Sequence, residues 1–251
     1  MKSLSFSRWF LAFALAAMIA PWLHAAADGP TPYPDPKNEA AWPGKGPIRV
    51  FLWMSDNRKY FWTQREKDKG AVVFVGDSLT GNWNAKLMVE LFPGLKVANR
   101  GIGGDVSRGV LFRLAEDVLD LEPRAIVLCI GTNDLSAHAD PAVVEGNIRA
   151  ILTLARTRYP EIPIVLCRIP PRDSAEAPTV PWAQADLNDR ISRIGAAQSH
   201  MAVLDLFAAL ADADGKPKLE YFRNDHLHLA DPGYRKWAEV VTPVLQKLGV
   251  K

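Results

Sequence analysis

The fold is decided by the stretch Ala71-Val-Val-Phe-Val75, which runs directly into Gly76-Asp-Ser-Leu79. An unbroken apolar run of this length, without alternating polar residues, predicts a β-strand that is buried on both faces. Four similar runs follow along the chain, at 95–98, 125–130, 162–166 and 202–206. The repetition of this pattern predicts five core strands.

Helical patterns separate these runs. In 105–121 the residues Val106, Val110, Leu114 and Val118 recur at the spacing of one helix face. The segment 141–158 and the C-terminal segment each begin with an Asp-Pro pair, which is typical of a helix start. Alternating strands and helices predict an α/β fold with a parallel sheet covered by helices on both faces. Ligands of such sheets bind outside the carboxyl ends of the strands, so functional residues are expected directly after each apolar run.

The composition excludes several classes of protein. The 251 residues include 30 Lys and Arg against 28 Asp and Glu, which leaves no basic excess for binding nucleic acid. An apolar share of 48% excludes a disordered chain. Two cysteines exclude a disulfide-stapled scaffold and a four-cysteine zinc site. Cys129 and Cys167 fall in two of the predicted strands and are expected to be buried small hydrophobes, with a disulfide between them as the alternative.

Residues 1–27 have the layout of a secretory signal peptide. Lys2 and Arg8 precede the apolar run 9–20, and Ala25-Ala26-Ala27 forms a small-residue cleavage site. This layout predicts export to the periplasm or the extracellular space, with no stable membrane insertion after cleavage. An uncleaved N-terminal anchor is the alternative. Without Lys2 and Arg8 the basic and acidic residues balance, so the positive excess belongs to the export signal.

The segment 28–70 is expected to be a spacer and an approach to the core, ahead of the main folded domain over 71–251. Its first part is rich in proline, which disfavours helix and promotes extended chain. The charged stretch 65–69 is expected to be a solvated face. The prolines that support this interpretation are Pro30, Pro32, Pro34, Pro36, Pro43 and Pro47.

Ser78 follows the first predicted strand on a tight turn. Such a turn, with Gly76 permitting the bend, exposes a serine as a candidate nucleophile. The alternative is that Ser78 only caps the next helix.

The second and third strands lead to candidate hydrogen-bond donors. Gly101, Gly103 and Gly104 leave backbone N–H groups open to a ligand near a helix start. A dinucleotide-binding loop is excluded, because the motif G-x-G-x-x-G would need glycine where Val106 stands. Asn133, after the third strand, carries an amide suited to stabilise an oxyanion. The alternatives are an ordinary turn and a helix cap.

Asp225 precedes His228 by three residues. A carboxylate at this spacing can orient an imidazole and stabilise its charged form. A metal site with His226 and His228 would need a third ligand, and neither His138 nor His200 has the spacing of one. His226 is expected to be a bystander, because only His228 stands three residues after an aspartate.

Together the motifs resemble the SGNH (GDSL) hydrolase superfamily, in particular the catalytic subunits of platelet-activating-factor acetylhydrolase and bacterial relatives. The resemblance covers about residues 71 to 248. The superfamily resemblance is carried by four blocks in order, Gly76-Asp-Ser78-Leu, Asn99-x-Gly101-Ile-x-Gly104-Asp105, Gly131-Thr-Asn133-Asp134 and Asp225-x-x-His228. The likeness to the acetylhydrolase subunits is carried by Phe74-Val-Gly-Asp-Ser78, Gly101-Ile-Gly-Gly-Asp105 and Leu227-His-Leu229 followed by Gly233-Tyr234.

The resemblance implies a flavodoxin-like three-layer α/β/α sandwich with a five-stranded parallel sheet, and no metal or organic cofactor. By position, Ser78 would be the nucleophile, His228 the general base and Asp225 the carboxylate that orients it. The oxyanion hole would comprise the backbone N–H groups of Ser78 and Gly104 and the side-chain amide of Asn133. The implied activity is ester hydrolysis through an acyl-enzyme.

The segment 170–182 is expected to form the rim of the site and so to limit which substrates fit. It has four prolines and three charged residues. Such a rim is unlike a wide apolar channel and favours a short acyl group, acetyl above all, on a carbohydrate or another polar alcohol. Trp182 is a candidate for stacking on a sugar ring, with core or surface packing as the alternative. A lysophospholipase, a broad arylesterase, and a glycan-binding module on a hydrolase-like scaffold are the competing functions.

Overall fold

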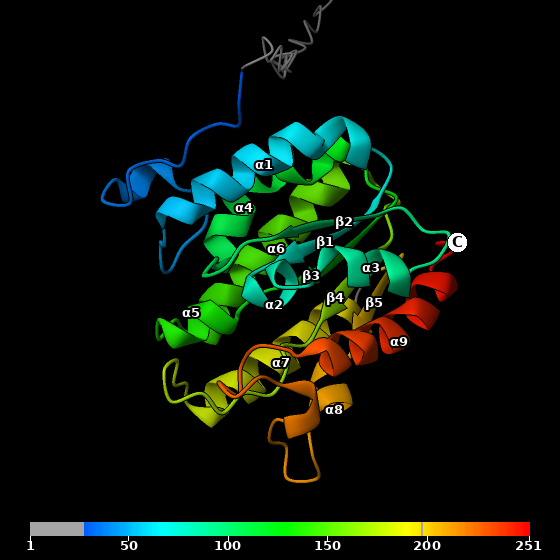
Figure 1. Cartoon of the computed structure of the whole chain (residues 1–251). Helices are drawn as coiled ribbons and strands as arrows, with labels where there is room; N and C mark the ends of the chain where they lie inside the picture. Colours follow the sequence, from blue (N-terminus) through cyan, green and yellow to red (C-terminus); the bar gives the residue numbers. More distant parts are fainter. Residues whose placement is uncertain (1–27, 197) are drawn as a thin grey trace, which may run out of the picture.

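The computed structural model describes residues 28–196 and 198–251 (Figure 1). The expected signal peptide at 1–27 lies outside the described residues. In the described part of the chain, no helix combines the length and the apolar character needed to cross a membrane.

A five-stranded parallel sheet forms the centre, as expected. The strand order is β2-β1-β3-β4-β5, so the first strand lies inside the sheet, and the next two along the chain flank it. The strands are β1 Val72–Gly76, β2 Val97–Gly101, β3 Ala125–Cys129, β4 Ile164–Cys167 and β5 Met201–Leu204. Strand β2 extends beyond the predicted apolar run because its polar residues have partners. Arg100, for example, pairs with Asp68 at 2.8 Å.

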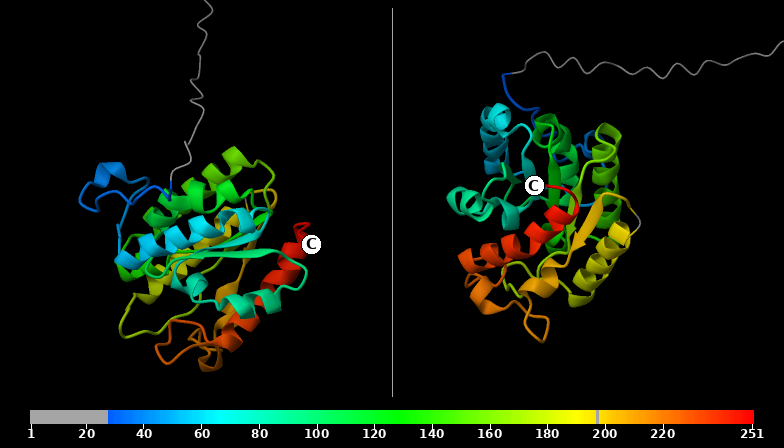
Figure 2. Two further views of the ribbon diagram at one scale, coloured as in Figure 1. Left: turned by 45° about the horizontal axis from the view of Figure 1, so that its top comes forward. Right: turned by 90° about the vertical axis from the view of Figure 1, so that its right-hand side faces the viewer.

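Helices cover both faces of this sheet (Figures 1 and 2). Alternate residues of β1 divide between two cores, with Val73 and Val75 facing one layer and Val72 and Phe74 facing the other. The first layer consists of α4 Ser107–Asp117, α6 Pro141–Arg158 and α7 Pro181–Ala196. The second consists of α3 Ala85–Leu91, α8 Leu206–Leu210 and α9 Asp231–Lys247. This is the predicted three-layer α/β/α sandwich.

The expected helices are present with small shifts at their ends. The segment 105–121 forms α4 followed by the 3-10 turn Leu119–Leu121, and α6 begins where Asp140 accepts a hydrogen bond from the N–H of Ala142. Two short helices, α2 Ser78–Gly81 and α5 Thr132–Ser136, follow β1 and β3 directly. Two further 3-10 turns span Glu39–Ala41 and Leu219–Tyr221.

The N-terminal segment differs from the expected spacer, because it packs on the domain. It contains α1 Leu52–Asp68, a helix that the sequence analysis missed. Trp42 is buried among aromatic rings that include Phe112 of α4. The guanidinium of Arg108, also on α4, donates to the carbonyl oxygens of Pro43 and Gly46. The predicted boundary at residue 71 therefore does not mark the start of the packed structure.

Cys129 and Cys167 are buried free cysteines on the neighbouring strands β3 and β4. Both belong to the core beneath α9. They have the buried hydrophobic role expected for them.

Candidate active site

Ser78 stands at the carboxyl end of β1, as the first residue of α2. Gly76, the last residue of β1, has no room for a side chain, because an added Cβ there would collide with the carbonyl oxygen of Cys129 on β3. Asp77 caps α2 by accepting the N–H of Leu79 at 2.9 Å. Asp77, and not Ser78, therefore caps this helix. The half-buried hydroxyl of Ser78 is available to other partners.

The structure joins Ser78, His228 and Asp225 in one hydrogen-bonded chain. His228 Nε2 lies 2.9 Å from Ser78 Oγ, and His228 Nδ1 lies 2.7 Å from Asp225 Oδ2. The other oxygen of Asp225 accepts the backbone N–H groups of Leu227 and His228. The loop before α9 therefore aims an imidazole at the serine from 150 residues away.

The charge state of Asp225 follows from these contacts. Burial opposes its ionisation, but the hydrogen bonds from the His228 ring and from two backbone N–H groups outweigh burial and lower its pKa. An ionised Asp225 requires the proton of a neutral His228 to sit on Nδ1. Nε2 is then free to accept a proton from Ser78.

Gly104 and Asn133 meet beside Asp105. The side-chain Nδ2 of Asn133 donates to the carbonyl oxygen of Asp105 at 3.0 Å. Asp105 is the residue that follows Gly104. Gly104 has φ of +84°, a conformation that favours glycine, and the ring of Phe51 fills the space where a side chain would begin. The loop also reaches the serine, because a Cβ added to Gly103 would lie 3.9 Å from Ser78 Cβ. The two candidate donors after β2 and β3 therefore lie together near the nucleophile.

His226 is not joined to the hydrogen-bonded chain of Ser78, His228 and Asp225. Its ring makes no hydrogen bond or ion pair with any of the described residues, whereas its backbone carbonyl accepts the N–H of Asp173. Only His228 makes the contacts that acid–base chemistry on Ser78 requires.

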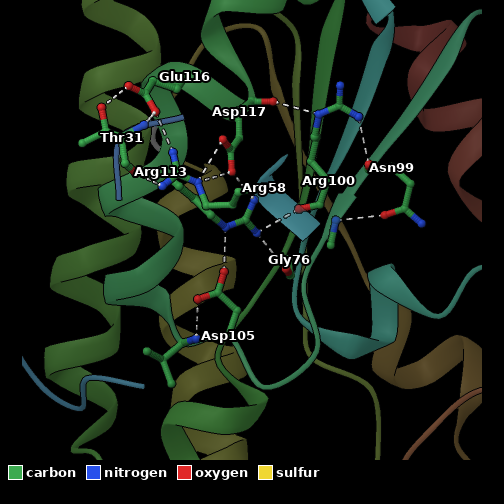
Figure 3. Close-up of polar contacts among 11 residues, drawn as sticks. Thr31, Arg58, Gly76, Asn99, Arg100, Asp105, Arg113, Glu116 and Asp117 are labelled. Carbon is green, nitrogen blue, oxygen red and sulfur yellow. Dashed lines mark hydrogen bonds and ion pairs between the residues drawn. The ribbon is translucent and has the colours of Figure 1, made fainter. Parts of the chain in front are cut away.

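A buried arginine network supports the loops of the site (Figure 3). Arg113 donates to Asp105 Oδ2 at 2.8 Å and to the carbonyl oxygens of Gly76 and Arg100, at the ends of β1 and β2. Its side chain is fully buried. The sequence analysis did not identify Arg113, although the residue stands seven positions after Val106, within the apolar stripe of α4. A charged residue in such a stripe indicates a buried partner.

Asp77 carries a carboxyl group in an unfavourable environment. Complete burial raises its pKa to about 7, and the nearby carboxylates of Asp105 and Asp134 act in the same direction. The N–H of Leu79 opposes this shift, while Asp77 Oδ2 has no hydrogen-bond partner among the described residues. The folded state therefore holds a proton on Asp77 between about pH 4 and about pH 7, where the unfolded chain releases it.

The variant Asp77→Asn tests this assignment. Wild-type stability should fall as the pH rises through this window, because only the unfolded state has already lost its proton. Asparagine keeps an acceptor for Leu79 and does not titrate. The free energy of unfolding of the variant relative to wild type should rise by at most about 4 kcal/mol from pH 4 to pH 8. Urea denaturation at each pH measures this, and parallel stability curves for the two proteins would contradict it.

A cavity of about 720 Å³ adjoins the site. The predicted rim 170–182 forms much of its wall, together with α7, and its polar lining includes Arg168, Gln184 and Lys216. Arg172, also in the wall, donates to the carbonyl of Thr132, the residue before Asn133. The catalytic candidates Ser78, Asp225 and His228 do not line this cavity, so it lies beside the reacting groups.

Comparison with known proteins identifies the same family that the four sequence motifs resemble. The profile of the GDSL-like Lipase/Acylhydrolase family matches residues 71–236. The alpha2 subunit of platelet-activating factor acetylhydrolase IB is 30% identical over 198 residues in both Homo sapiens and Rattus norvegicus, which is 78% of this chain and 84% of that subunit. A GDSL-like lipase from Bacteroides thetaiotaomicron shares the fold, with a TM-score of 0.64 and 23% identity over 75% of this chain and 97% of the lipase. The chain belongs to the GDSL-like lipase/acylhydrolase family and is a carboxylic ester hydrolase.

Proposed function

We propose that this protein is an exported serine esterase that removes short acyl groups, acetyl above all, from a carbohydrate or another polar alcohol. The observation that carries the proposal is the hydrogen-bonded chain from Asp225 through His228 to Ser78. A serine hydroxyl is a weak nucleophile until a neighbouring base takes its proton, and His228 is that base.

The reaction has two halves. Ser78 Oγ attacks the ester carbonyl carbon while His228 Nε2 takes the hydroxyl proton, and Asp225 stabilises the imidazolium that results. His228 then gives this proton to the departing alcohol, which leaves an acyl group on Ser78. In the second half a water molecule attacks the acyl-enzyme, His228 takes a proton from the water and returns it to Ser78, and the free acid departs.

Charge on the carbonyl oxygen needs donors that are already in position. The proposed oxyanion hole combines the backbone N–H groups of Ser78 and Gly104 with the side-chain amide of Asn133. The second N–H of the Asn133 amide has no acceptor among the described residues, because a primary amide has two hydrogens and the contact to Asp105 uses one. Donors held in this way act without reorganising during the reaction.

Two observations support the substrate class. The curated relatives at 30% identity are named for removing an acetyl group, which supports a short acyl chain here. The lining of the cavity beside the site includes acidic, basic and amide side chains, among them Asp173, Asn188 and Lys216, which suit an alcohol with many hydroxyl groups. The expected signal peptide would bring the enzyme to glycans outside the cytoplasm.

A chain-length series of p-nitrophenyl esters tests the proposal. We expect kcat/KM to be highest for C2 to C4 esters and to fall steadily for longer chains. A maximum at C8 or above would contradict the short-acyl proposal and support a lysophospholipase or a broad esterase. Labelling of Ser78 by a fluorophosphonate provides a separate test, because a glycan-binding module would not need an activated serine.

A further inference from the structure

Arg49 connects the N-terminal segment to the proposed oxyanion hole. It precedes both α1 and the region 71–236 matched by the family profile. Its Nη1 donates to Asn133 Oδ1 at 3.3 Å, which is at the long end for such a bond. The contact spans 84 residues of sequence, and no part of the signature motifs contains Arg49.

Two contacts together determine how the Asn133 amide is turned. The Oδ1 atom faces the guanidinium of Arg49, and the Nδ2 atom faces the carbonyl oxygen of Asp105. A rotation by half a turn would place two donors against each other at Arg49 and two acceptors against each other at Asp105. The amide is therefore held with its free N–H available, and the cation on Oδ1 polarises that N–H as a donor.

Aromatic residues anchor the same segment to the other half of the hole. Trp53 Nε1 donates to the carbonyl oxygen of Gly103 at 2.8 Å. The ring of Phe51 covers Gly104 and stacks on Trp53, with centroids 4.5 Å apart. Residues 49–53 thus contact both the glycine loop after β2 and the amide after β3.

The charge of Arg49 is not neutralised locally. Within residues 28–196 and 198–251, Arg49 makes no ion pair with a carboxylate, unlike Arg100 and Arg113. A half-buried positive charge next to Asn133 favours negative charge where the carbonyl oxygen of the substrate becomes an oxyanion.

From these contacts we infer that Arg49 is a positioning residue, which orients and polarises the Asn133 amide for the transition state. Residues 49–53 are then part of the working enzyme, although they lie outside the region 71–236 that the family profile matches. The inference rests on the proposed esterase function, since it concerns the proposed oxyanion hole.

A double-mutant cycle with Asn133 tests the inference. In the wild-type background, Arg49→Met should lower kcat for p-nitrophenyl acetate by about tenfold with little change in KM, because a charged donor is lost. Asn133→Ala should lower kcat by about 10²–10³-fold. If Arg49 acts through Asn133, adding Arg49→Met to Asn133→Ala should change kcat by less than about twofold. Arg49→Lys should restore part of the wild-type kcat, because it keeps the charge and a donor.

Lys45→Met is the matched control, since Lys45 is an exposed cation of the same segment. Its side chain makes no contact with the site, and the variant should keep wild-type kcat. Multiplicative losses in the cycle, or an effect of Arg49→Met confined to KM, would overturn the inference and show that Arg49 acts elsewhere.

The rate of fluorophosphonate labelling separates this inference from the proposed substrate. Labelling also needs the oxyanion hole but requires no natural ester, so the cycle can be repeated on that rate. If wild type is labelled at Ser78 but hydrolyses none of the short esters, the substrate proposal fails while the cycle still tests Arg49. If the wild-type protein is folded, as thermal unfolding shows, but is not labelled at Ser78, the serine mechanism itself fails.

Discussion

Replacing Ser78 with alanine is expected to lower kcat for short esters by about 10⁴-fold or more while the protein stays folded. Loss of the nucleophile in enzymes of this chemistry removes nearly all of the rate that the serine, histidine and aspartate supply together. The hydroxyl is half-buried, and its partner His228 is partly exposed and keeps its hydrogen bond to Asp225, so the substitution should leave the fold intact. Steady-state kinetics with p-nitrophenyl acetate gives the loss, and thermal unfolding checks the fold.

The neighbouring histidines provide a matched control. His228→Asn should also lower kcat by several orders of magnitude, because it removes the base. His226 has φ of +51°, a conformation that asparagine tolerates, so His226→Asn should fold normally and keep kcat within a few-fold of wild type. Turnover by Ser78→Ala close to that of wild type would exclude Ser78 as the nucleophile. Equal losses for the two histidine variants would mean that the wrong histidine has been assigned.

Arg113→Ala is expected to produce the largest loss of stability, about 3–5 kcal/mol in the free energy of unfolding. The substitution leaves Asp105 and Asp117, both buried, without the guanidinium that lies 2.8 and 3.4 Å from them. It also removes the donor to the carbonyl oxygens of Gly76 and Arg100 (Figure 3). Because a domain is stable by only about 5–15 kcal/mol, the loss is a large fraction of the total.

Urea denaturation measures this loss, and Arg149→Ala serves as its control. Arg149 pairs with Glu145 at 2.7 Å but is about half exposed, with a relative side-chain accessibility of 51%, so its removal should cost less than about 1 kcal/mol. A similar cost for the two variants would show that the buried network adds little to stability.

The pH dependence of Arg113→Ala gives a second check. Burial already raises the pKa of Asp105 and of Asp117, and Arg113 is among the groups that lower them again. Without Arg113 the folded-state pKa values rise further above the unfolded value. The folded state then binds more protons, so the deficit in stability relative to wild type should shrink as the pH falls towards about 4.

The core strands were predictable because their signal is local. A strand buried on both faces needs an unbroken apolar run, and the runs at 71–75 and 125–130 coincide closely with β1 and β3. Helix α1 was not predictable in this way. It buries few side chains, and one of them is Arg58, whose partner Asp117 lies 59 residues away. An apolar periodicity cannot reveal a helix whose attachment to the domain is partly ionic.

In the candidate site, too, the local features could be predicted from the sequence and the long-range contacts could not. The Asp225–His228 pair is separated by three residues, so a single turn can form it and the spacing reveals it. The meeting of His228 with Ser78 requires 150 residues of intervening sheet and helix, and only the resemblance to a known family anticipated it. Arg49, Trp53 and Arg113 are absent from every motif, because each acts through a partner that is distant in sequence.

The amino-acid sequence was thus sufficient for the five core strands, the helices over 105–121, 141–158 and at the C-terminus, the tight turn at Ser78 and the family, because these features depend on residues a few positions apart. Folding was needed to show that residues 28–70 pack on the domain and that Arg49 contacts the Asn133 amide. These features arise from hydrogen bonds and ion pairs between distant segments. The energy of such contacts depends on burial and geometry, which exist only once the chain has folded.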